Sequence, residues 1–333
     1  MQLTWAAATV QDRPPHEKTA LTGESGSATE ISVVLPVFNE EAILQELHRR
    51  LVAALAPLGP FELVYVDDGS SDGSLDVLRS LAGQDPRAGV LAFSRNFGHQ
   101  VALTAGLDHA RGQAVVLMDS DLQDPPELIP ELVARWREGF DVVYAQRRAR
   151  PGESAFKRVT AFAFYRIMRA IGSVEIPPDT GDFRLLSRRA ADALGSLRER
   201  RRFLRGLVTW SGFRQARVLY DRPPRRAGES KYRIGHMVRL ALLGTFYFST
   251  MPLALIGWVG AAVCLGAVVA GALGLPAVAA AAFFLGGVQL VALWVLGQYL
   301  GGVAEEVRHR PLYLLRETLN VQPRSISEEC SPR

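Results

Sequence analysis

Short apolar runs alternate with helical patterns from residue 31 to residue 146, and this alternation constrains the fold more than any other feature. A short continuous apolar run indicates a strand covered on both faces, whereas apolar residues three and four positions apart indicate an amphipathic helix. Strands that alternate with helices are typical of a mostly parallel sheet with right-handed crossovers. The sequence therefore predicts an α/β domain. The predicted strands are 31–37, 61–68, 89–94, 114–119 and 141–146, and the predicted helices are 40–55, 74–83, 99–112 and 126–139.

The pattern becomes weaker after residue 150. We expect a helix over 154–172 and two further strands over 182–187 and 214–220. The triplet Arg200–Arg202 lies in a densely basic stretch, and we interpret it as an electrostatic patch that faces anionic lipid. Residues 222–232 combine prolines, arginines and a glycine, which predicts a basic loop.

No Lys, Arg, Asp, Glu or His occurs between Leu240 and Ala304. Since about 20 apolar residues cross a bilayer, this stretch is long enough to cross twice, with a turn at 274–276. We therefore predict a transmembrane hairpin of two helices near 250–273 and 277–300. The alternative is a buried helical hairpin in a soluble core, where an uninterrupted apolar stretch of this length is uncommon.

Basic residues flank only the outer ends of the uncharged stretch, at Arg233, Arg239, Arg308, Arg310 and Arg316. Basic flanks usually face the cytoplasm, so both termini and the α/β domain are expected there, on a multi-pass protein of a bacterial-type inner membrane. Mixed basic and apolar residues predict amphipathic juxtamembrane helices on either side of the hairpin. The predicted divisions are a disordered tail 1–30, the α/β domain 31–231, a juxtamembrane segment 232–249, transmembrane helices within 250–300, a second juxtamembrane helix 301–320 and a flexible tail 321–333.

Acidic residues gather where the predicted strands end. Asp67 and Asp68 follow the second strand, and Asp119 and Asp121 follow the fourth. Open parallel sheets bind ligands at the carboxyl ends of their strands, so these carboxylates are candidates for a binding site. The two cysteines of the chain have no metal-type spacing, so a metal would have to use oxygen ligands.

Asp119, Asp121 and Gln123 alternate along the chain, so their side-chain oxygens can surround one cation. Mg²⁺ and Mn²⁺ prefer oxygen ligands, and they often keep water or a substrate phosphate as further ligands. We therefore predict a divalent-cation site, for Mg²⁺ or Mn²⁺, that bridges to a diphosphate. The alternative is that an aspartate caps the helix that follows Pro125, and we favour this role for Asp124.

Six motifs occur in a characteristic order, and together they carry more information than the D-x-D alone. They are LPVFNEE (35–41), VDDGSSDGS (66–74), SRNFGHQVALTAGLDHARG (94–112), MDSDLQDPPE (118–127), GDFRLLSR (181–188) and GESKY (228–232). Over about residues 31–320 the chain resembles the inverting family-two glycosyltransferases. It is most similar to the polyprenyl-phosphate group, which includes dolichyl-phosphate mannose synthase and the bactoprenol glucosyltransferases.

The resemblance implies a nucleotide-binding domain of the GT-A type and a nucleotide-sugar donor, with UDP favoured over GDP. Phe38 stands where the family usually has Tyr, so a hydroxyl contact is lost there while ring packing can remain. Three of the assigned residues also have a structural alternative, which is a strand end for Pro36, a helix N-terminus for Glu40 and the D-G turn for Asp68. The implied nucleotide contacts are Pro36, Phe38, Glu40, Asp67, Asp68 and Asp119, and the implied metal ligands are Asp119, Asp121 and Gln123.

A lipid phosphate and a departing diphosphate both require cations. Arg pairs bidentately with phosphate, and Lys supplies a mobile point charge. We expect Asp182 to orient the acceptor or a basic partner. The candidates for the acceptor phosphate are Arg147, Arg148, Arg166 and Arg184, and the predicted catalytic residues are Asp121, Asp182, Arg184 and Lys231.

The expected reaction transfers one sugar to a polyprenyl (undecaprenyl) phosphate with inversion, for modification of a cell-envelope glycan. The acceptor needs no strong base, because the second pKa of a phosphate monoester is about 6. One alternative is a processive polysaccharide synthase, but the only Arg-Trp of the chain lies in LVARW (132–136), too early for its Q-x-x-R-W motif. A second alternative is a non-catalytic membrane scaffold. The expected partners are the nucleotide-sugar donor, the polyprenyl phosphate and the bilayer. A homo-oligomer is possible. Binding to nucleic acid is disfavoured.

Overall fold

The computed structural model describes residues 29–148, 180–200, 202–220 and 278–321, together with scattered positions between 256 and 269. Several predictions concern segments that lie outside these residues, although residues 29, 30 and 321 of the two predicted tails are described. They concern the tail 1–30, the helix 154–172, Arg166, the segment 221–249 with Lys231, and the tail 321–333. The first predicted transmembrane helix is described only at scattered positions.

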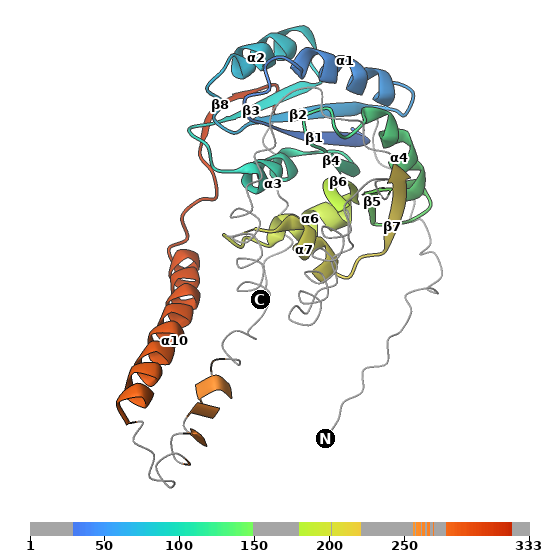
Figure 1. The fold of residues 1–333 in the computed structure, drawn as a ribbon. Helices are drawn as coiled ribbons and strands as arrows, with labels where there is room; N and C mark the ends of the chain where they lie inside the picture. Colours follow the sequence, from blue (N-terminus) through green and yellow to red (C-terminus); the bar gives the residue numbers. More distant parts are fainter. Residues whose placement is uncertain are drawn as a thin grey trace, which may run out of the picture.

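A mixed sheet of eight strands runs through the described chain in the order β7-β5-β6-β4-β1-β2-β3-β8 (Figure 1). β1 pairs in parallel with β2 and β4, and β2 pairs in parallel with β3. β6 runs antiparallel between β4 and β5, and β8 runs antiparallel to β3. The predicted α/β domain with a mostly parallel sheet is therefore confirmed. The strands are β1 Ile31–Val37, β2 Phe61–Asp67, β3 Ala88–Phe93, β4 Ala114–Leu117, β5 Val142–Arg147, β6 Thr180–Ser187, β7 Gln215–Tyr220 and β8 Leu315–Leu319.

Helices cover both faces of this sheet (Figure 1). Alternate residues of β1 point to opposite sides, so Val33 and Leu35 pack in the cluster with α1, α2 and α4, while Val34 packs in the cluster with α3, α6 and α7. This two-sided burial explains why the strands read as continuous apolar runs. The helices are α1 Leu44–Leu55, α2 Ser74–Gln84, α3 His99–His109, η1 Pro126–Leu128, α4 Ile129–Arg137, α6 Arg188–Ser196, α7 Leu204–Trp210 and α10 Val278–Val307.

Several elements end earlier than predicted, and the ends of β4 and α3 have structural consequences. β4 ends at Leu117, two residues before the predicted end at Asp119, which leaves the carboxylate of Asp119 in the following loop. α3 ends at His109, although the prediction extended it to Gly112. Gly112 instead donates its backbone N–H to the Ser32 hydroxyl, and a Cβ at Gly112 would lie 2.6 Å from the backbone nitrogen of Ser32. The chain therefore leaves the helix in order to pass close to β1.

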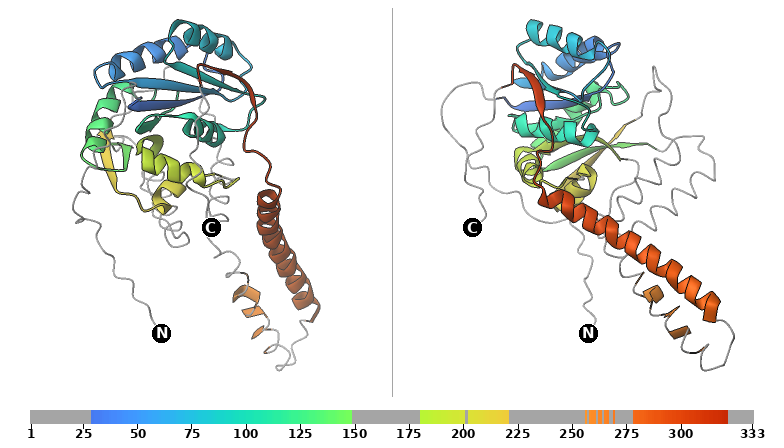
Figure 2. Two further views of the ribbon diagram at one scale, coloured as in Figure 1. Left: turned by 180° about the vertical axis from the view of Figure 1, so that it is seen from behind. Right: turned by 90° about the vertical axis from the view of Figure 1, so that its left-hand side faces the viewer.

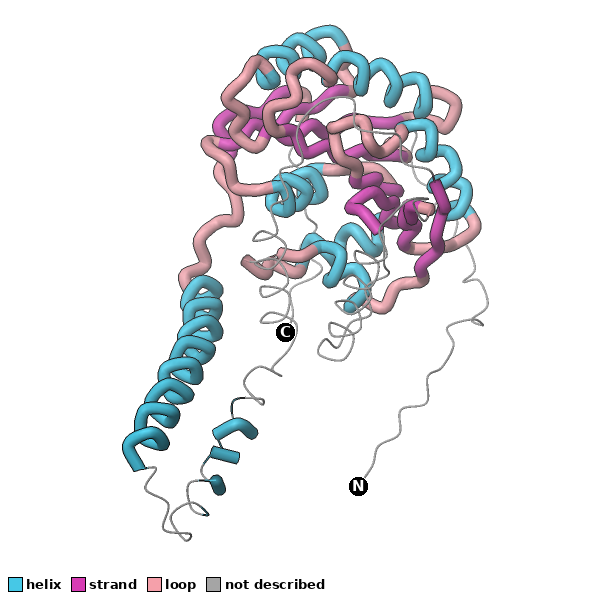
Figure 3. The backbone as a smooth tube through the Cα atoms, viewed as in Figure 1, coloured by secondary structure: helices cyan, strands magenta, loops and turns pink. Residues whose placement is uncertain are grey.

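The second predicted juxtamembrane helix, over 301–320, is wrong in its second half. Residues 301–307 belong to α10, but β8 then pairs with the edge of β3 (Figure 3). The pairing is supported from α2, because the Arg79 guanidinium binds the Glu317 carboxylate. Asn320 follows β8 and donates its side-chain amide to the backbone oxygens of Ala82 and Ala88. These long-range contacts outweigh the local helical pattern.

Within the described residues, no helix combines the length and the apolarity needed to cross a membrane. The predicted transmembrane hairpin near 250–300 is therefore not confirmed. α10 begins at Val278, one residue after the predicted start of the second helix, and runs for 30 residues. Figure 2 shows it extending away from the sheet. Its exposed large apolar side chains are Leu285, Val291, Leu293, Trp294, Leu296, Leu300, Val303 and Val307.

Candidate active site

The candidate site lies where β1, β2 and β4 end. Leu117, the last residue of β4, pairs with Arg184 of the antiparallel strand β6. Asp182, two residues earlier in β6, therefore lies beside the loop that follows β4 and begins with Met118 and Asp119. This register brings a residue from the GDFRLLSR motif next to the D-x-D.

The loop after β4 has an unusual backbone conformation. Leu122 has a φ of 58°, in the left-handed region that a bulky residue rarely adopts, and its side chain is buried. The Gln123 backbone N–H donates to Asp121 Oδ1 at 3.1 Å, and the Ser120 hydroxyl donates to the Pro36 carbonyl at 2.7 Å. The loop is therefore held both internally and against β1. Strain of this kind is found most often at functional sites.

The surroundings of Asp119 strongly affect its ionisation. Burial raises the pKa of its carboxyl group, and the nearby His99 only partly opposes the rise. Like charges raise the pKa further, and they come from Asp124, Asp182 and Asp121. A cation would relieve this concentration of negative charge.

One polar atom adds to the case for a cation. Asp119 Oδ1 is buried and accepts no hydrogen bond from the described residues, although His99 Nε2 lies 3.4 Å away. Gln123 Nε2 is also buried without a hydrogen-bond partner in the described part of the chain, but an amide nitrogen is a donor and does not bind a cation. No group of three His, Cys, Asp or Glu side chains in the described chain is arranged to hold a metal ion. Asp119 and Asp121 would therefore supply only part of the coordination of a cation, and water or a substrate phosphate would supply the rest, as is common for Mg²⁺ and Mn²⁺.

Asp124 does not cap the helix that follows it, so the favoured prediction for this residue was wrong. Neither η1 nor α4 has a side-chain hydrogen bond at its cap. The Asp124 carboxylate is fully buried and accepts a hydrogen bond of 2.7 Å from the Tyr220 hydroxyl at the end of β7. Since β7 is distant in sequence, local capping rules could not predict this partner.

Asp182 is surrounded by donors. The Arg205 Nε and Nη2 atoms lie 2.8 and 3.2 Å from its two oxygens, and the Gln100 side-chain amide donates at 3.1 Å. His99 Nε2 lies 3.3 Å from Asp182 Oδ2. Burial alone would raise the pKa of Asp182, but the hydrogen bond from His99 and the charges of Arg205 and Arg184 hold it well below its usual range. Asp182 is therefore an ionised anchor for basic partners and a poor proton acceptor.

The predictions from sequence did not include His99, Gln100 or Arg205. His99 and Gln100 open α3, the helix that follows the loop after β3, so the rule that ligands gather at carboxyl ends of strands gave a usable signal for them. Arg205 lies on α7, and nothing in the sequence indicated that α7 packs beside β6. The expectation that Asp182 would orient a basic partner agrees with the observed Arg205 contact.

Asp68 and Asp67 play different structural parts. The Asp68 carboxylate accepts backbone hydrogen bonds from Phe97 at 2.6 Å and from Gly98 at 3.0 Å, so it holds the turn before α3. Asp67 is buried at the end of β2 and accepts from the Ser70 backbone N–H at 3.3 Å. The nucleotide contacts assigned to both residues stay predictions.

The first motif lies beside these aspartates. Pro36 is within β1, where it pairs with Val66, and the Phe38 side chain is 40% exposed just after the strand. The Glu40 backbone N–H donates to the Ser74 hydroxyl at the start of α2. An exposed ring close to the ends of β1 and β2 is compatible with the predicted packing of Phe38 against a nucleotide.

The described arginines differ widely in accessibility. Arg184 is buried and donates to the Gly181 carbonyl at 2.9 Å, whereas Arg147 lies 3.3 Å from the Tyr220 hydroxyl and Arg148 is exposed. Their roles at an acceptor phosphate stay predictions.

Arg202 is buried and donates to the carbonyls of Leu194 and Leu197, so its interpretation as part of a lipid-facing patch was wrong.

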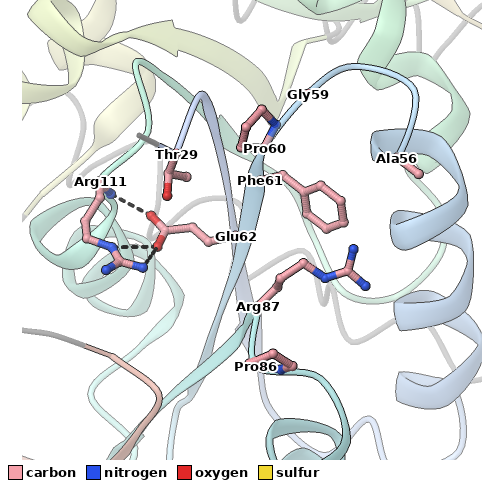
Figure 4. A pocket seen from close by; sticks show the side chains of 9 residues that line it. All are labelled: Thr29, Ala56, Gly59, Pro60, Phe61, Glu62, Pro86, Arg87 and Arg111. Carbon is pink, nitrogen blue, oxygen red and sulfur yellow. Dashed lines mark hydrogen bonds and ion pairs between the residues drawn. The ribbon is translucent and has the colours of Figure 1, made fainter. Parts of the chain in front are cut away.

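A separate cavity of about 420 Å³ lies at the opposite ends of these strands (Figure 4). Its charged residues are already paired in part, because Arg111 binds Glu62 at 2.7 Å and the Arg87 guanidinium lies over the Phe61 ring at 4.5 Å. It contains none of the predicted site residues. The lining residues are Thr29, Ala56, Gly59, Pro60, Phe61, Glu62, Pro86, Arg87 and Arg111.

Comparison with known proteins gives consistent matches. Residues 32–195 match the family described as glycosyl transferase family 2. The chain is 43% identical to an uncharacterized glycosyltransferase of Synechocystis sp., over 86% of this chain and 95% of that protein. It is 39% identical to the bactoprenol glucosyl transferase of Shigella phage SfII, over 88% of this chain and 99% of that protein.

Among solved structures, the chain is similar to glucosyl-3-phosphoglycerate synthase from Mycobacterium tuberculosis in complex with phosphoglyceric acid. The sequence identity is 23% and the TM-score is 0.46, with 66% of this chain and 80% of that chain covered.

Proposed function

The chain belongs to glycosyl transferase family 2, and from this premise we propose that it transfers one sugar from a nucleotide-diphosphate sugar to a polyprenyl phosphate, with inversion at the anomeric carbon. One observation carries the proposal. The D-x-D loop after β4 lies next to Asp182, an ionised carboxylate that binds Arg205. An acidic cation site and a basic group thus adjoin, as a donor diphosphate and an acceptor phosphate require.

The acceptor class is supported by the relatives. Proteins that are 37–39% identical over most of this chain carry the name bactoprenol glucosyl transferase or its prophage homolog. For the donor, a UDP-sugar is proposed in preference to a GDP-sugar. The product is a polyprenyl-phosphate-linked monosaccharide, which we assign to modification of a cell-envelope glycan.

Asp119, Asp121 and Gln123 would hold a divalent cation, Mg²⁺ or Mn²⁺, and that cation would supply positive charge to the donor diphosphate. Without a cation the loop would repel a diphosphate, because three further carboxyl groups, those of Asp121, Asp124 and Asp182, lie near Asp119. Phe38 would pack against the nucleotide, since its ring is exposed near the end of β1.

The acceptor phosphate would attack the anomeric carbon with one of its oxygens. The bond from that carbon to the diphosphate breaks, and the nucleoside diphosphate departs with the electron pair. Because the phosphate is largely ionised at neutral pH, Asp182 is not needed as a base. Its proposed task is to hold Arg205 at 2.8 Å, so that this guanidinium is oriented toward phosphate.

We also propose that the protein works at a bacterial-type inner membrane, with the catalytic domain and both termini cytoplasmic. The support is the uncharged stretch 240–304 with its basic outer flanks, together with exposed apolar side chains of α10 such as Leu293 and Trp294. Cysteine labelling at position 275 from each side of intact cells tests the orientation. Labelling only from the cytoplasmic side would contradict a hairpin that crosses twice. A homo-oligomer stays compatible with this arrangement.

The function is tested with purified full-length protein, Mn²⁺ or Mg²⁺, polyprenyl phosphate and a panel of UDP- and GDP-sugars. The lipid product is identified by mass, and its anomeric configuration by nuclear magnetic resonance. We expect the mass of the acceptor plus one sugar, and a configuration opposite to that of the donor. A product with many sugars would point to a processive synthase, and a retained configuration would contradict inversion.

A further inference from the structure

His99 stands between two carboxylates that come from different strands. Its Nε2 atom lies 3.4 Å from Asp119 Oδ1, just after β4, and 3.3 Å from Asp182 Oδ2 in β6. One imidazole nitrogen is therefore close to both the proposed cation ligand and the carboxylate that holds Arg205. About 43% of the His99 side chain is exposed, so it borders the open part of the site.

The position of His99 is set by Asp68. Asp68 follows β2, and its carboxylate accepts hydrogen bonds from the backbone N–H groups of Phe97 and Gly98. Gly98 has a φ of 103°, and α3 begins at the next residue, which is His99. A carboxylate that holds two successive amides fixes where this helix starts, and it therefore fixes where the first side chain of the helix lies.

The first turn of α3 has a second contact with the same centre. The Gln100 side-chain amide donates to Asp182 at 3.1 Å, and its oxygen accepts the Leu204 backbone N–H at 3.0 Å. Leu204 is the first residue of α7, which also carries Arg205. The start of α3 thus supports Asp182 directly and the helix of Arg205 through one hydrogen bond.

We propose that His99 is a positioning residue of the sugar transfer, held by Asp68, which keeps Asp119 and Asp182 at a fixed separation. The inference rests on the proposed function, since it assigns His99 to the junction of the donor and acceptor sides. Residues that orient a metal ligand usually change metal affinity or activity about 10- to 100-fold when they are mutated, and His99 can orient Asp119 through its ion-pair contact of 3.4 Å. Asp68, by this reasoning, acts through His99 and makes no contact of its own with the reacting groups.

The test compares His99→Ala, His99→Gln, Asp68→Asn and the double variant Asp68→Asn/His99→Ala. For His99→Ala we expect kcat to fall about 10-fold or more, and the Mn²⁺ concentration that supports half-maximal UDP binding to rise about 10-fold. UDP binding is measured by calorimetry without acceptor or turnover. His99→Gln should recover part of both losses, because its amide can donate from a similar position.

The double variant tests whether Asp68 acts through His99. Asp68→Asn alone should lower kcat, but it should add little to the loss caused by His99→Ala, because residues that act through one another are not additive. The matched control is His109→Ala at the other end of α3, where the ring contacts the Ala105 carbonyl. It should leave kcat and the Mn²⁺ requirement unchanged. Circular dichroism and thermal unfolding verify that each variant is folded.

The outcomes separate this inference from the proposed function. If the folded His99→Ala variant keeps the wild-type kcat and Mn²⁺ requirement, the positioning role is wrong. If the Asp68→Asn and His99→Ala losses multiply, Asp68 acts independently and the link between them is wrong. If wild-type protein transfers no sugar to polyprenyl phosphate, the proposed function fails, while the Mn²⁺-dependent UDP binding of the same variants still decides the role of His99.

Discussion

Tyr220 donates its hydroxyl hydrogen to Asp124 Oδ1 over 2.7 Å, so the last residue of β7 holds the loop that follows β4. Both residues are buried, and burial together with the Asp124 charge raises the pKa of Tyr220 to about 12. The hydroxyl therefore stays protonated and donating at neutral pH. The contact connects one edge of the sheet to the candidate cation loop.

We predict that Tyr220→Phe lowers the free energy of unfolding by about 1–3 kcal/mol, because a buried carboxylate loses a hydrogen-bond donor. Urea denaturation monitored by circular dichroism measures the loss. Tyr144→Phe in the neighbouring strand β5 is the control, with an expected change below about 0.5 kcal/mol. Equal stability of Tyr220→Phe and wild type would mean that the hydroxyl contact contributes nothing to folding.

The Asp121→Asn variant is expected to abolish transfer and to leave the fold intact. One carboxylate of the D-x-D is lost, which weakens the cation that would stabilise the departing diphosphate. Turnover at several Mn²⁺ concentrations and circular dichroism are measured on the same sample. Near-normal, metal-dependent turnover by the folded variant would remove Asp121 from the cation site.

Arg205→Gln should lower kcat about 10- to 150-fold. The estimate follows from a charge-assisted hydrogen bond of about 1.5–3 kcal/mol and a tenfold change in rate per 1.4 kcal/mol. The control is Arg189→Gln, because Arg189 also pairs with an aspartate, Asp141 at 2.8 Å, but lies on α6. Steady-state kinetics with a short-chain acceptor measure both variants. An unchanged kcat for Arg205→Gln would show that the Asp182–Arg205 pair is only structural.

Local sequence patterns were sufficient for much of the fold. β1, β2 and β3 were predicted within one residue at each end, because each is an apolar run covered on both faces. β8 was missed, since its sequence LRETL places two adjacent charged residues and a threonine between two leucines, and its partner, β3, lies more than 200 residues earlier. A strand whose pairing depends on such a distant edge has no local signal.

The same limit applies to the site. The D-x-D could be predicted because its two aspartates are only two positions apart in sequence. The contacts of Asp182 with His99 and Arg205, in contrast, depend on how three elements pack. Asp124 shows the converse case. Its local context predicted a helix cap, but tertiary packing placed it against Tyr220.

Acid should destabilise the protein partly through Asp85. The hydrogen bond from Arg87 lowers the pKa of Asp85, and burial raises it by a smaller amount, so this pKa lies below its ordinary value. A depressed pKa in the folded state means that this carboxylate stabilises the fold above its unfolded pKa of about 3.9, and that the contribution is lost as pH falls through the folded pKa. Asp85→Asn should therefore be less stable than wild type at pH 7, with a smaller further loss on acidification. Unfolding free energies between pH 7 and pH 2 measure this, and parallel curves would contradict it.

The last prediction concerns the attachment of β8. Asn320 follows β8 with a φ of 53°, a conformation that Asn tolerates better than Ala does. Its side-chain amide also donates to the backbone oxygens of Ala82, at 2.7 Å, and Ala88. Asn320→Ala removes both contacts, so we expect the free energy of unfolding to fall by about 1–2 kcal/mol.

The loss should be local to the edge of the sheet. Hydrogen exchange of the β8 amides, such as that of Thr318, should become faster, while exchange in the central strand β1 changes little. Asn320→Gly is the matched control, because Gly adopts the positive φ without strain yet also lacks the amide. If Asn320→Gly is as stable as wild type, the backbone conformation and not the pair of hydrogen bonds explains the effect. If neither variant speeds exchange in β8, Asn320 does not hold the strand on β3.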